Sequence, residues 1–344
     1  MKRLSLLMSV AALAGLITGC QSVPPSAFPP AQKTLGKVER LDPALDALLP
    51  GGAQMEMLGS GFNWSEGPIW IAAEKAVLFS DVPENTVYRW KPSSGVQVAF
   101  KPSGYTGSVP RGGEPGSNGL TTDKQGRLLL CQHGDRQIAR REKDGRFTAL
   151  ATNYQGKRFN SPNDLVVKSN GDIYFTDPPY GLEKNNADPK KEIPFNGVYR
   201  LQPDGKVTLL IDSLTFPNGL AFSPDEKLLY VAVSDGNNPV IMAYDVQPDG
   251  LVANGRVFFD ANPLKKPGAK GSPDGMKVDK SGNLWATGPG GVLVISAKGK
   301  HLGTLATGEA TANCAFGDDG STLYITADMH FVRIRTNVKG CGFN

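Results

Sequence analysis

The sequence predicts an all-β fold: a six-bladed β-propeller with a metal site at one mouth of the central channel. Six segments of the 344-residue chain repeat one pattern, in which a polar residue precedes a short apolar strand, a tight turn and a second apolar strand. Turn residues interrupt the chain roughly every ten residues, as in all-β folds. Helical periodicity is almost missing, and only "LDPALDALLP" near residue 41 predicts a short helix.

The repeat is defined by one polar residue, the anchor, at the start of the first strand of each segment. Successive anchors are 52, 45, 55, 56 and 39 residues apart. Spacings of this size fit four-stranded propeller blades, whereas the coils of a β-solenoid are much shorter. The anchors are Glu66, Asn118, Asn163, Asn218, Asp274 and Asn313.

The innermost strand of each propeller blade lines the channel, so we expect the six anchors to form a ring at one mouth. One Glu, one Asp and four Asn offer hard oxygen ligands, which Ca²⁺ accepts in loose geometry. Zn²⁺ prefers His or Cys, and Mg²⁺ a strict octahedron. Ca²⁺ is therefore favoured, with Mg²⁺, Mn²⁺ and Zn²⁺ as alternatives. The competing interpretation is that Asn-Gly and Asp-Gly mark only turns.

The second strand of each repeat returns toward the ring, so its last residue should lie on the same face. Among these residues we single out His133, in "CQHGD", and Asp177, in "YFTDPPYG". A lone His is also commonly a structural hydrogen-bonding group. Two long insertions, residues 101–116 and 181–197, should reach this face as binding loops or lids. The strand-end residues are Asp81, His133, Asp177, Asp235 and Asp328.

Five segments in order carry a resemblance to a known family: "SEGPIW", "SPNDLVV", "TDPPYG", "FPNGLAFSPDEKLLYV" and "SPDGMKVDKSGNLW". Over about residues 60–335 the chain resembles the gluconolactonase/regucalcin (SMP-30/gluconolactonase/LRE-like) family of six-bladed propellers. The resemblance implies a metal-dependent hydrolase that opens sugar lactones. It implies Ca²⁺ ligands at Glu66, Asn163, Asn218 and Asp274.

The same resemblance implies which groups meet the substrate. Asn118, Asn163 and His133 would bind the lactone, and Asp274, Asp177 or His133 would activate water. A metal that polarises the carbonyl needs no dedicated nucleophile, which agrees with the lack of a Gly-x-Ser-x-Gly motif. The chain departs from the family at Ser161, where regucalcin-like members carry Arg, so the exact lactone is open.

Other functions remain compatible with this pattern. The same ring could serve another lactonase or a phosphotriesterase such as diisopropyl fluorophosphatase. A calcium-stabilised binding or scaffold propeller at the cell envelope is the non-enzymatic alternative. A strictosidine-synthase-like condensing enzyme is disfavoured, because those relatives lack the metal ring.

The first residues predict export. Residues 1–19 resemble a lipoprotein signal peptide, since Lys2 and Arg3 precede an apolar run that ends in "ITGC". Cys20 would then carry lipid, residues 20–45 would form a tether, and residues 46–344 the propeller. A plain cleaved signal is the alternative. We expect a periplasm-facing bacterial envelope lipoprotein, and the lack of Asp after Cys20 favours the outer membrane.

Charge and cysteine content limit the partners. The formal charge is +4 without a basic block, so we expect no nucleic-acid partner. The expected partner is a small lactone, with membrane contact only through the lipid, and the closed propeller should be a monomer. An oxidising compartment would allow one disulfide, and we expect Cys314–Cys341.

Overall fold

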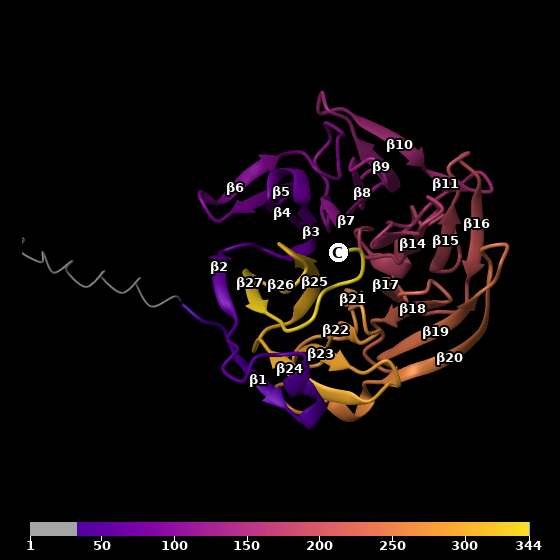
Figure 1. The fold of residues 1–344 in the computed structure, drawn as a ribbon. Coiled ribbons are helices and arrows are strands. Elements are labelled where there is room, and N and C mark those ends of the chain that lie inside the picture. The colour runs from indigo at the N-terminus through magenta and orange to yellow at the C-terminus, as the bar shows by residue number, and fades with distance from the viewer. Residues whose placement is uncertain (1–32, 344) are drawn as a thin grey trace, which may run out of the picture. The chain divides into compact units, whose positions relative to one another are not determined.

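The structure, a computed structural model that describes residues 33–343, is a ring of six antiparallel β-sheets (Figure 1). Each sheet is one blade, built mainly from consecutive strands. Helix in the described part is limited to short 3₁₀ segments: η1 (Pro43–Ala47), η2 (Ala72–Glu74), η3 (Asn185–Ala187) and η4 (Asn262–Leu264). The predicted all-β six-bladed propeller is confirmed, and η1 is the short helix expected near residue 41.

The first three blades each take four consecutive strands. Blade 1 consists of β3 (Ser65–Ile71), β4 (Ala76–Asp81), β5 (Thr86–Lys91) and β6 (Gly95–Phe100). Blade 2 consists of β7 (Ser117–Thr122), β8 (Leu128–Gln132), β9 (Gln137–Arg141) and β10 (Phe147–Ala151). A small ribbon follows, formed by β11 (Asn153–Tyr154) and β12 (Lys157–Arg158). Blade 3 consists of β13 (Leu165–Val167), β14 (Ile173–Asp177), β15 (Gly197–Leu201) and β16 (Val207–Ile211).

The last three blades include two strands from the start of the described chain. Blade 4 consists of β17 (Pro217–Phe222), β18 (Leu228–Val233), β19 (Val240–Val246) and β20 (Val252–Asp260). Blade 5 consists of β21 (Met276–Val278), β22 (Leu284–Gly288), β23 (Gly291–Ile295), β24 (His301–Ala306) and β1 (Lys37–Arg40). Blade 6 consists of β25 (Thr311–Gly317), β26 (Thr322–Ala327), β27 (His330–Arg335) and β2 (Glu56–Ser60).

The ring closes because strands from opposite ends of the sequence meet. The first strands of successive blades contact one another, and β25 of blade 6 contacts β3 of blade 1. Strand β2 pairs antiparallel with β27, with Glu56 opposite Arg333, so it forms the outer strand of the last blade. The side chains of Phe79 and Phe331 stack at 4.4 Å between blades 1 and 6, inside a hydrophobic cluster. Burying each such ring contributes about 1.5–3 kcal/mol.

The predicted tether is too long. Residues 37–40 lie within the expected tether, but β1 pairs with β24, with Lys37 opposite Ala306. The folded part therefore starts before residue 46. "KVER" is short and charged, so only its pairing partner makes it a strand. The signal peptide, residues 1–19, and the lipidation site Cys20 lie outside the described residues. Within 33–343, no helix is long and apolar enough to cross a membrane.

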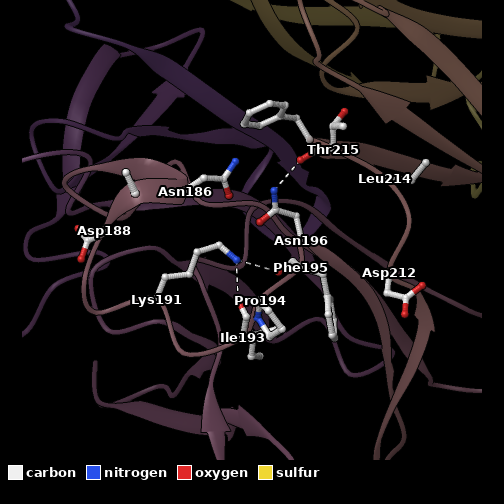
Figure 2. A pocket seen from close by; sticks show the side chains of 12 residues that line it. Asn186, Asp188, Lys191, Ile193, Pro194, Phe195, Asn196, Asp212, Leu214 and Thr215 are labelled. Atoms are coloured by element: carbon white, nitrogen blue, oxygen red, sulfur yellow. Dashed lines mark hydrogen bonds between the residues drawn. The ribbon is translucent and has the colours of Figure 1, made fainter.

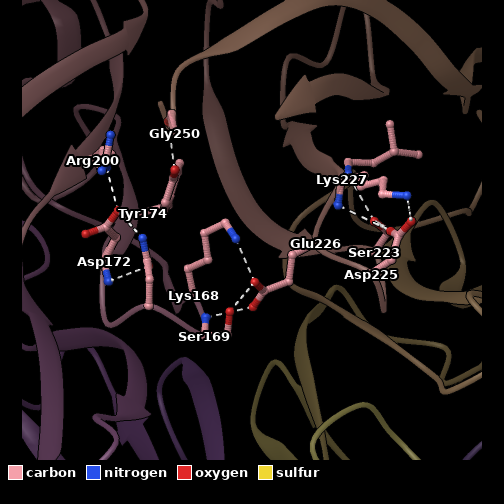
Figure 3. A network of polar contacts seen from close by, with 12 residues as sticks. Lys168, Ser169, Asp172, Tyr174, Arg200, Ser223, Asp225, Glu226, Lys227 and Gly250 are labelled. Atoms are coloured by element: carbon pink, nitrogen blue, oxygen red, sulfur yellow. Dashed lines mark hydrogen bonds and ion pairs between the residues drawn. The ribbon is translucent and has the colours of Figure 1, made fainter. Parts of the chain in front are cut away.

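Polar side chains link neighbouring blades at their turns, as between blades 3 and 4 (Figure 3). Lys168, in the β13–β14 turn, forms a 2.6 Å ion pair with Glu226, in the β17–β18 turn. The same carboxylate accepts from the backbone N–H of Ser169 at 2.7 Å. Tyr174 donates to the carbonyl of Gly250 at 2.7 Å, again across blades. These contacts fix the angle between blades, and so the shape of the channel that they enclose.

The expected disulfide is wrong. Cys131, Cys314 and Cys341 are all free thiols. The Cys314 thiol is buried in the core and lies 3.2 Å from the carbonyl of Trp285. The Cys341 thiol lies 3.3 Å from the carbonyl of Asp279. The two sulfur atoms therefore contact different carbonyl groups and not each other.

Gly219 lies at a close approach between blades 4 and 5 near the channel. A Cβ on this residue would lie 2.1 Å from the carbonyl oxygen of Asp274 in the next blade. Because both partners are backbone, no rotamer change relieves the clash. We expect Gly219→Ala to lower the free energy of unfolding by about 1–3 kcal/mol, the usual cost of overpacking. Urea denaturation measures this change.

The matched control is Gly236→Ala in the same blade. No atom lies within 4 Å of its built Cβ, and its backbone is not left-handed. We expect this variant to unfold within about 0.5 kcal/mol of the wild type. Equal destabilisation of both variants would contradict the close approach at Gly219.

Candidate metal and active site

The six anchors lie at one end of the innermost strands, where they form the predicted ring. Asn313 Nδ2 lies 3.3 Å from Glu66 Oε2, which joins the last anchor to the first. Gly119 N donates to the carbonyl of Asn163 at 2.7 Å, and a Cβ on Gly275 would meet the side chain of Asn313. Five of the anchors are almost fully buried, and Asp274 is partly buried. The structure therefore places the anchors where the sequence predicted them, at one mouth of the channel.

The anchors do not lie in turns, which excludes the competing interpretation of the Asn-Gly pairs. In blades 1, 2, 4 and 6 the strand pairing shifts register at or next to the anchor, as it does between Pro217 and Leu220. Such a β-bulge re-aims side chains and ends regular pairing. In blades 3 and 5 the first strand begins only after the anchor, at Leu165 and at Met276. Both arrangements free the anchor side chain from the sheet.

Three carboxylates are crowded at this ring, and one of them was not predicted. Burial, together with the nearby Asp164 carboxylate, raises the pKa of Glu66. Burial raises the pKa of Asp274 well above its usual value, and the Glu66 and Asp164 charges raise it further. Burial also raises the pKa of Asp164, against the opposing effect of Lys277. The ring is therefore a place where negative charge is costly without a cation.

Asp164 was missed because the repeat suggested no role for it. Four anchors are followed by Gly, but "PNDL" has Asp after its Asn. Asp164 Oδ2 accepts from Asn313 Nδ2 at 3.3 Å, so Asn313 bridges two carboxylates. The replacement of Gly by Asp after the anchor of the third repeat was the sequence feature that could have identified Asp164.

Several ring oxygens lack a hydrogen-bond donor. Oδ1 of Asn118, Oδ1 of Asn163 and Oδ1 of Asp274 are buried and unpaired. A buried polar atom without a partner costs about 1–3 kcal/mol, so three at one place call for an explanation. Amide and carboxylate oxygens are the ligands of a hard divalent cation. The residues present fit such an ion.

The side chains at the ring do not form a metal site of the kind that is built mainly from charged ligands. Among residues 33–343, no group of three or more His, Cys, Asp and Glu side chains is arranged to hold a metal. The ring instead combines few carboxylates with amide oxygens. Asn218, a predicted ligand, directs its amide nitrogen to Ser234 Oγ at 3.0 Å.

His133 lies beside the ring and is fully buried. Its Nε2 is 3.4 Å from Asn163 Nδ2, and its Nδ1 is 3.2 Å from Glu114 Oε2. The Nδ1 contact has ion-pair distance but not hydrogen-bond alignment, since Nδ1 counts as unpaired. Glu114 belongs to the first insertion, residues 101–116, and sequence reasoning missed it. Only the folded position of that loop identifies it.

Asp177 does not present a free carboxylate. Its Oδ2 accepts from Asn160 N and its Oδ1 from Ser161 N, both at 2.8 Å. Asp81 holds the loop of blade 1 in the same way, accepting from Asn63 N and Trp64 N at 3.1 and 3.2 Å. This geometry argues against the catalytic role predicted for Asp177. The residue fixes the segment that leads to its anchor.

The two insertions reach the ring face, as predicted, since Glu114 of the first and Gly181 of the second lie against His133. Arg111 of the first insertion donates to the carbonyl of Gly134 at 3.0 Å and to that of Gly181 in the second.

The second insertion, residues 181–197, borders a hollow of about 530 Å³ (Figure 2). In that hollow Lys191 donates to the carbonyls of Ile193 and Phe195, and Asn196 donates to that of Thr215. None of the anchors lines it, so it is separate from the ring.

These observations define a class: a six-bladed propeller with a buried cluster of carboxylate and amide oxygens at one channel mouth, bordered by two loops. The chain belongs to the SMP-30/gluconolactonase/LRE-like family, whose model matches residues 64–328. The resemblance inferred from the ordered segments is therefore confirmed.

Individual relatives agree with this assignment. The gluconolactonase of Zymomonas mobilis is 41% identical over 319 residues, which cover 89% of this chain and 88% of that protein. The solved structure of the gluconolactonase XC5397 from Xanthomonas campestris is 34% identical, with a TM-score of 0.76 over 90% of this chain and 99% of that chain. A calcium-binding regucalcin from Agrobacterium tumefaciens has a TM-score of 0.64 at 21% identity, covers 83% of this chain and 94% of that chain, and shows the shared fold alone.

Metal binding is testable through stability. We expect CaCl₂ added to chelator-treated protein to raise Tm, because an ion that binds only the folded state stabilises it. At a concentration of 100 Kd the gain is about 2.7 kcal/mol, or roughly 4 °C for a domain of this size. Differential scanning calorimetry measures the shift.

Two variants test whether the ring is responsible. Glu66→Gln should remove most of the calcium-dependent shift. Glu74→Gln, on the solvent-exposed turn after β3, should keep it. A wild-type Tm that no divalent cation changes would argue against a metal at this ring.

The role of Asp177 is also testable. Asp177→Asn leaves one of two backbone N–H groups without an acceptor, so we expect a loss of about 1–3 kcal/mol in unfolding free energy. Burial raises the pKa of Asp177 to about 7. The stability that depends on its protonation is therefore present below about pH 4 and lost as pH rises through 7. The wild type should lose more stability across that window than the variant.

Denaturation at pH 5 and pH 8 checks both statements. Asp81→Asn is the matched variant, because burial also raises the pKa of Asp81. Both variants should keep lactone turnover per folded molecule. Loss of turnover only in Asp177→Asn, with normal stability, would restore the catalytic interpretation.

Proposed function

We propose that this protein is a metal-dependent lactonase that hydrolyses sugar lactones such as glucono-1,5-lactone. The observation that carries the proposal is the ring with three unpaired buried oxygens, on Asn118, Asn163 and Asp274, beside the Glu66 carboxylate. Two similar proteins are named gluconolactonases, at 41% and 34% identity. A 26% identical relative from Haloferax volcanii is named a pentonolactonase.

We assign the metal to Glu66, Asn163, Asn218 and Asp274, and Ca²⁺ is the ion that oxygen ligands favour. A regucalcin of the same fold is described as calcium-binding, which supports this choice. The bound ion would supply Lewis-acid stabilisation of the negative charge that develops on the lactone carbonyl. Asn118 and Asn163 would position the substrate through their amide groups.

The chain's own groups would move the proton. In this proposal Asp274 takes a proton from the attacking water, because its Oδ1 is buried, unpaired and part of the ring. His133 is the second candidate for the general base, since Glu114 lies against its Nδ1 and would hold the imidazole in one orientation. The two insertions would keep bulk water away from the reacting lactone.

If the protein is a binding propeller with a purely structural metal site, it should hydrolyse none of the lactones or organophosphates tested. A phosphotriesterase would act on organophosphates instead of lactones. Neither alternative has a separate observation in its favour here, and the relatives named above favour lactone hydrolysis.

We expect the fragment that begins at Lys33 to hydrolyse glucono-1,5-lactone, to lose activity with EDTA and to regain it with a divalent cation. Proton release gives the rate. Asp274→Asn should lower kcat by 100-fold or more, the scale of a lost general base. Asp235→Asn is the control: its carboxylate accepts from Thr215 and Asn237 N, and turnover should stay within threefold.

Circular dichroism must show that each variant is folded. Undiminished turnover in Asp274→Asn would reject Asp274 as the base and leave His133. Activity that resists EDTA would reject the metal. An active organophosphate assay with no lactone turnover would favour the phosphotriesterase.

A further inference from the structure

The short loop formed by residues 178–182 is fixed against the ring face by Ser161. Ser161 is fully buried, and its hydroxyl donates to the carbonyl of Pro178 at 2.6 Å and accepts from Gly181 N at 2.9 Å. A Cβ on Gly181 would lie 2.6 Å from the Cβ atoms of both His133 and Ser161. The loop therefore packs directly on His133. Since its hydroxyl both donates to this loop and accepts from it, Ser161 positions the loop.

The first insertion holds the same loop from the other side. Arg111 donates to the carbonyls of Gly134 and Gly181, so one guanidinium ties the first insertion to blade 2 and to the loop. Two independent attachments, at Ser161 and at Arg111, give the loop one conformation. A side chain in a fixed loop loses little entropy when it binds a ligand.

Tyr180 is the aromatic residue of this loop, and it lies against the start of blade 4. Its ring stacks on Phe216 at 5.9 Å between centroids and 20° between planes, two residues before the anchor Asn218. The hydroxyl of Ser234 lies close enough to lower the pKa of Tyr180, against the larger effect of burial. Ser234 Oγ accepts from Asn218 Nδ2 and donates to the carbonyl of Pro273, next to Asp274. Tyr180 is thus one side chain away from two predicted ligands.

The hydroxyl of Tyr180 stays neutral in this setting. Burial, and after it the negative charge of Asp274, raises the pKa of Tyr180 far above its ordinary value. A phenolic hydroxyl has one donor and two acceptor positions, so a bond to one neighbour leaves the others open. At least one position is left for a ligand. Tyr180 is only partly buried, so a ligand can reach it.

We propose that Tyr180 binds substrate through a hydrogen bond between its hydroxyl and a hydroxyl group of the lactone, and thereby selects sugar lactones over unsubstituted lactones. This inference rests on the lactonase function proposed above. A site that hydrogen-bonds a substrate hydroxyl rejects the analogue that lacks it, because its own polar group is then left unpaired. Ser161 is the positioning residue that places Tyr180.

The experiment compares glucono-1,5-lactone with δ-valerolactone, which has the same ring without hydroxyl groups. In Tyr180→Phe, kcat/KM for glucono-1,5-lactone should fall about tenfold or more, mainly through a higher KM. For δ-valerolactone it should stay within twofold of the wild type. Tyr154→Phe is the control, since its hydroxyl accepts only from Gln155 in the distant ribbon, and both substrates should be unaffected.

Ser161→Ala tests the positioning role. It should shift the ratio of the two kcat/KM values in the same direction, whereas general destabilisation would lower both values together. An unchanged ratio in Tyr180→Phe, or an equal fall for both substrates, would overturn the inference while the lactonase function stands. Wild-type protein that hydrolyses neither lactone with any divalent cation would overturn the proposed function, and this inference with it.

Discussion

Closure of the ring is the constraint on which the rest of the structure depends. Blade 6 takes its outer strand, β2, from the start of the described chain, and its innermost strand, β25, lies against β3 of blade 1. Glu66 and Asn313, 247 residues apart in the sequence, become hydrogen-bonded neighbours through this closure. Six innermost strands around one channel leave little room at the mouth, which is why Gly219 faces the backbone of Asp274 so closely.

The same closure concentrates negative charge where water is scarce. Glu66, Asp164 and Asp274 have raised pKa values because burial disfavours their ionised forms. Such an arrangement lowers the stability of the empty protein, since buried charges need a partner. A divalent cation would supply that partner, so binding and folding would be coupled. Functional sites commonly carry this kind of local instability on an otherwise rigid scaffold.

The insertions turn a symmetric ring into a one-sided site. The blades repeat, but the insertions at residues 101–116 and 181–197 differ from the repeat, and Arg111 joins one to the other. His133, Glu114 and Tyr180 all come from these loops or touch them. The repeat therefore builds the oxygen ring, and its interruptions build the surroundings that distinguish one substrate from another.

The sequence by itself determined the blade number, the innermost strands and the six anchors, because these follow from local alternation and a repeated spacing. It did not determine which oxygens stay free. Asp177 stands at a strand end on the ring face, where the sequence predicted a catalytic residue. In the folded loop, however, its carboxylate accepts hydrogen bonds from two backbone N–H groups. Asp164, Glu114 and β1 likewise acquire their roles only from partners that are distant in sequence. Hydrogen bonds and ion pairs depend on which groups meet in space, and only ring closure and loop packing bring those groups together.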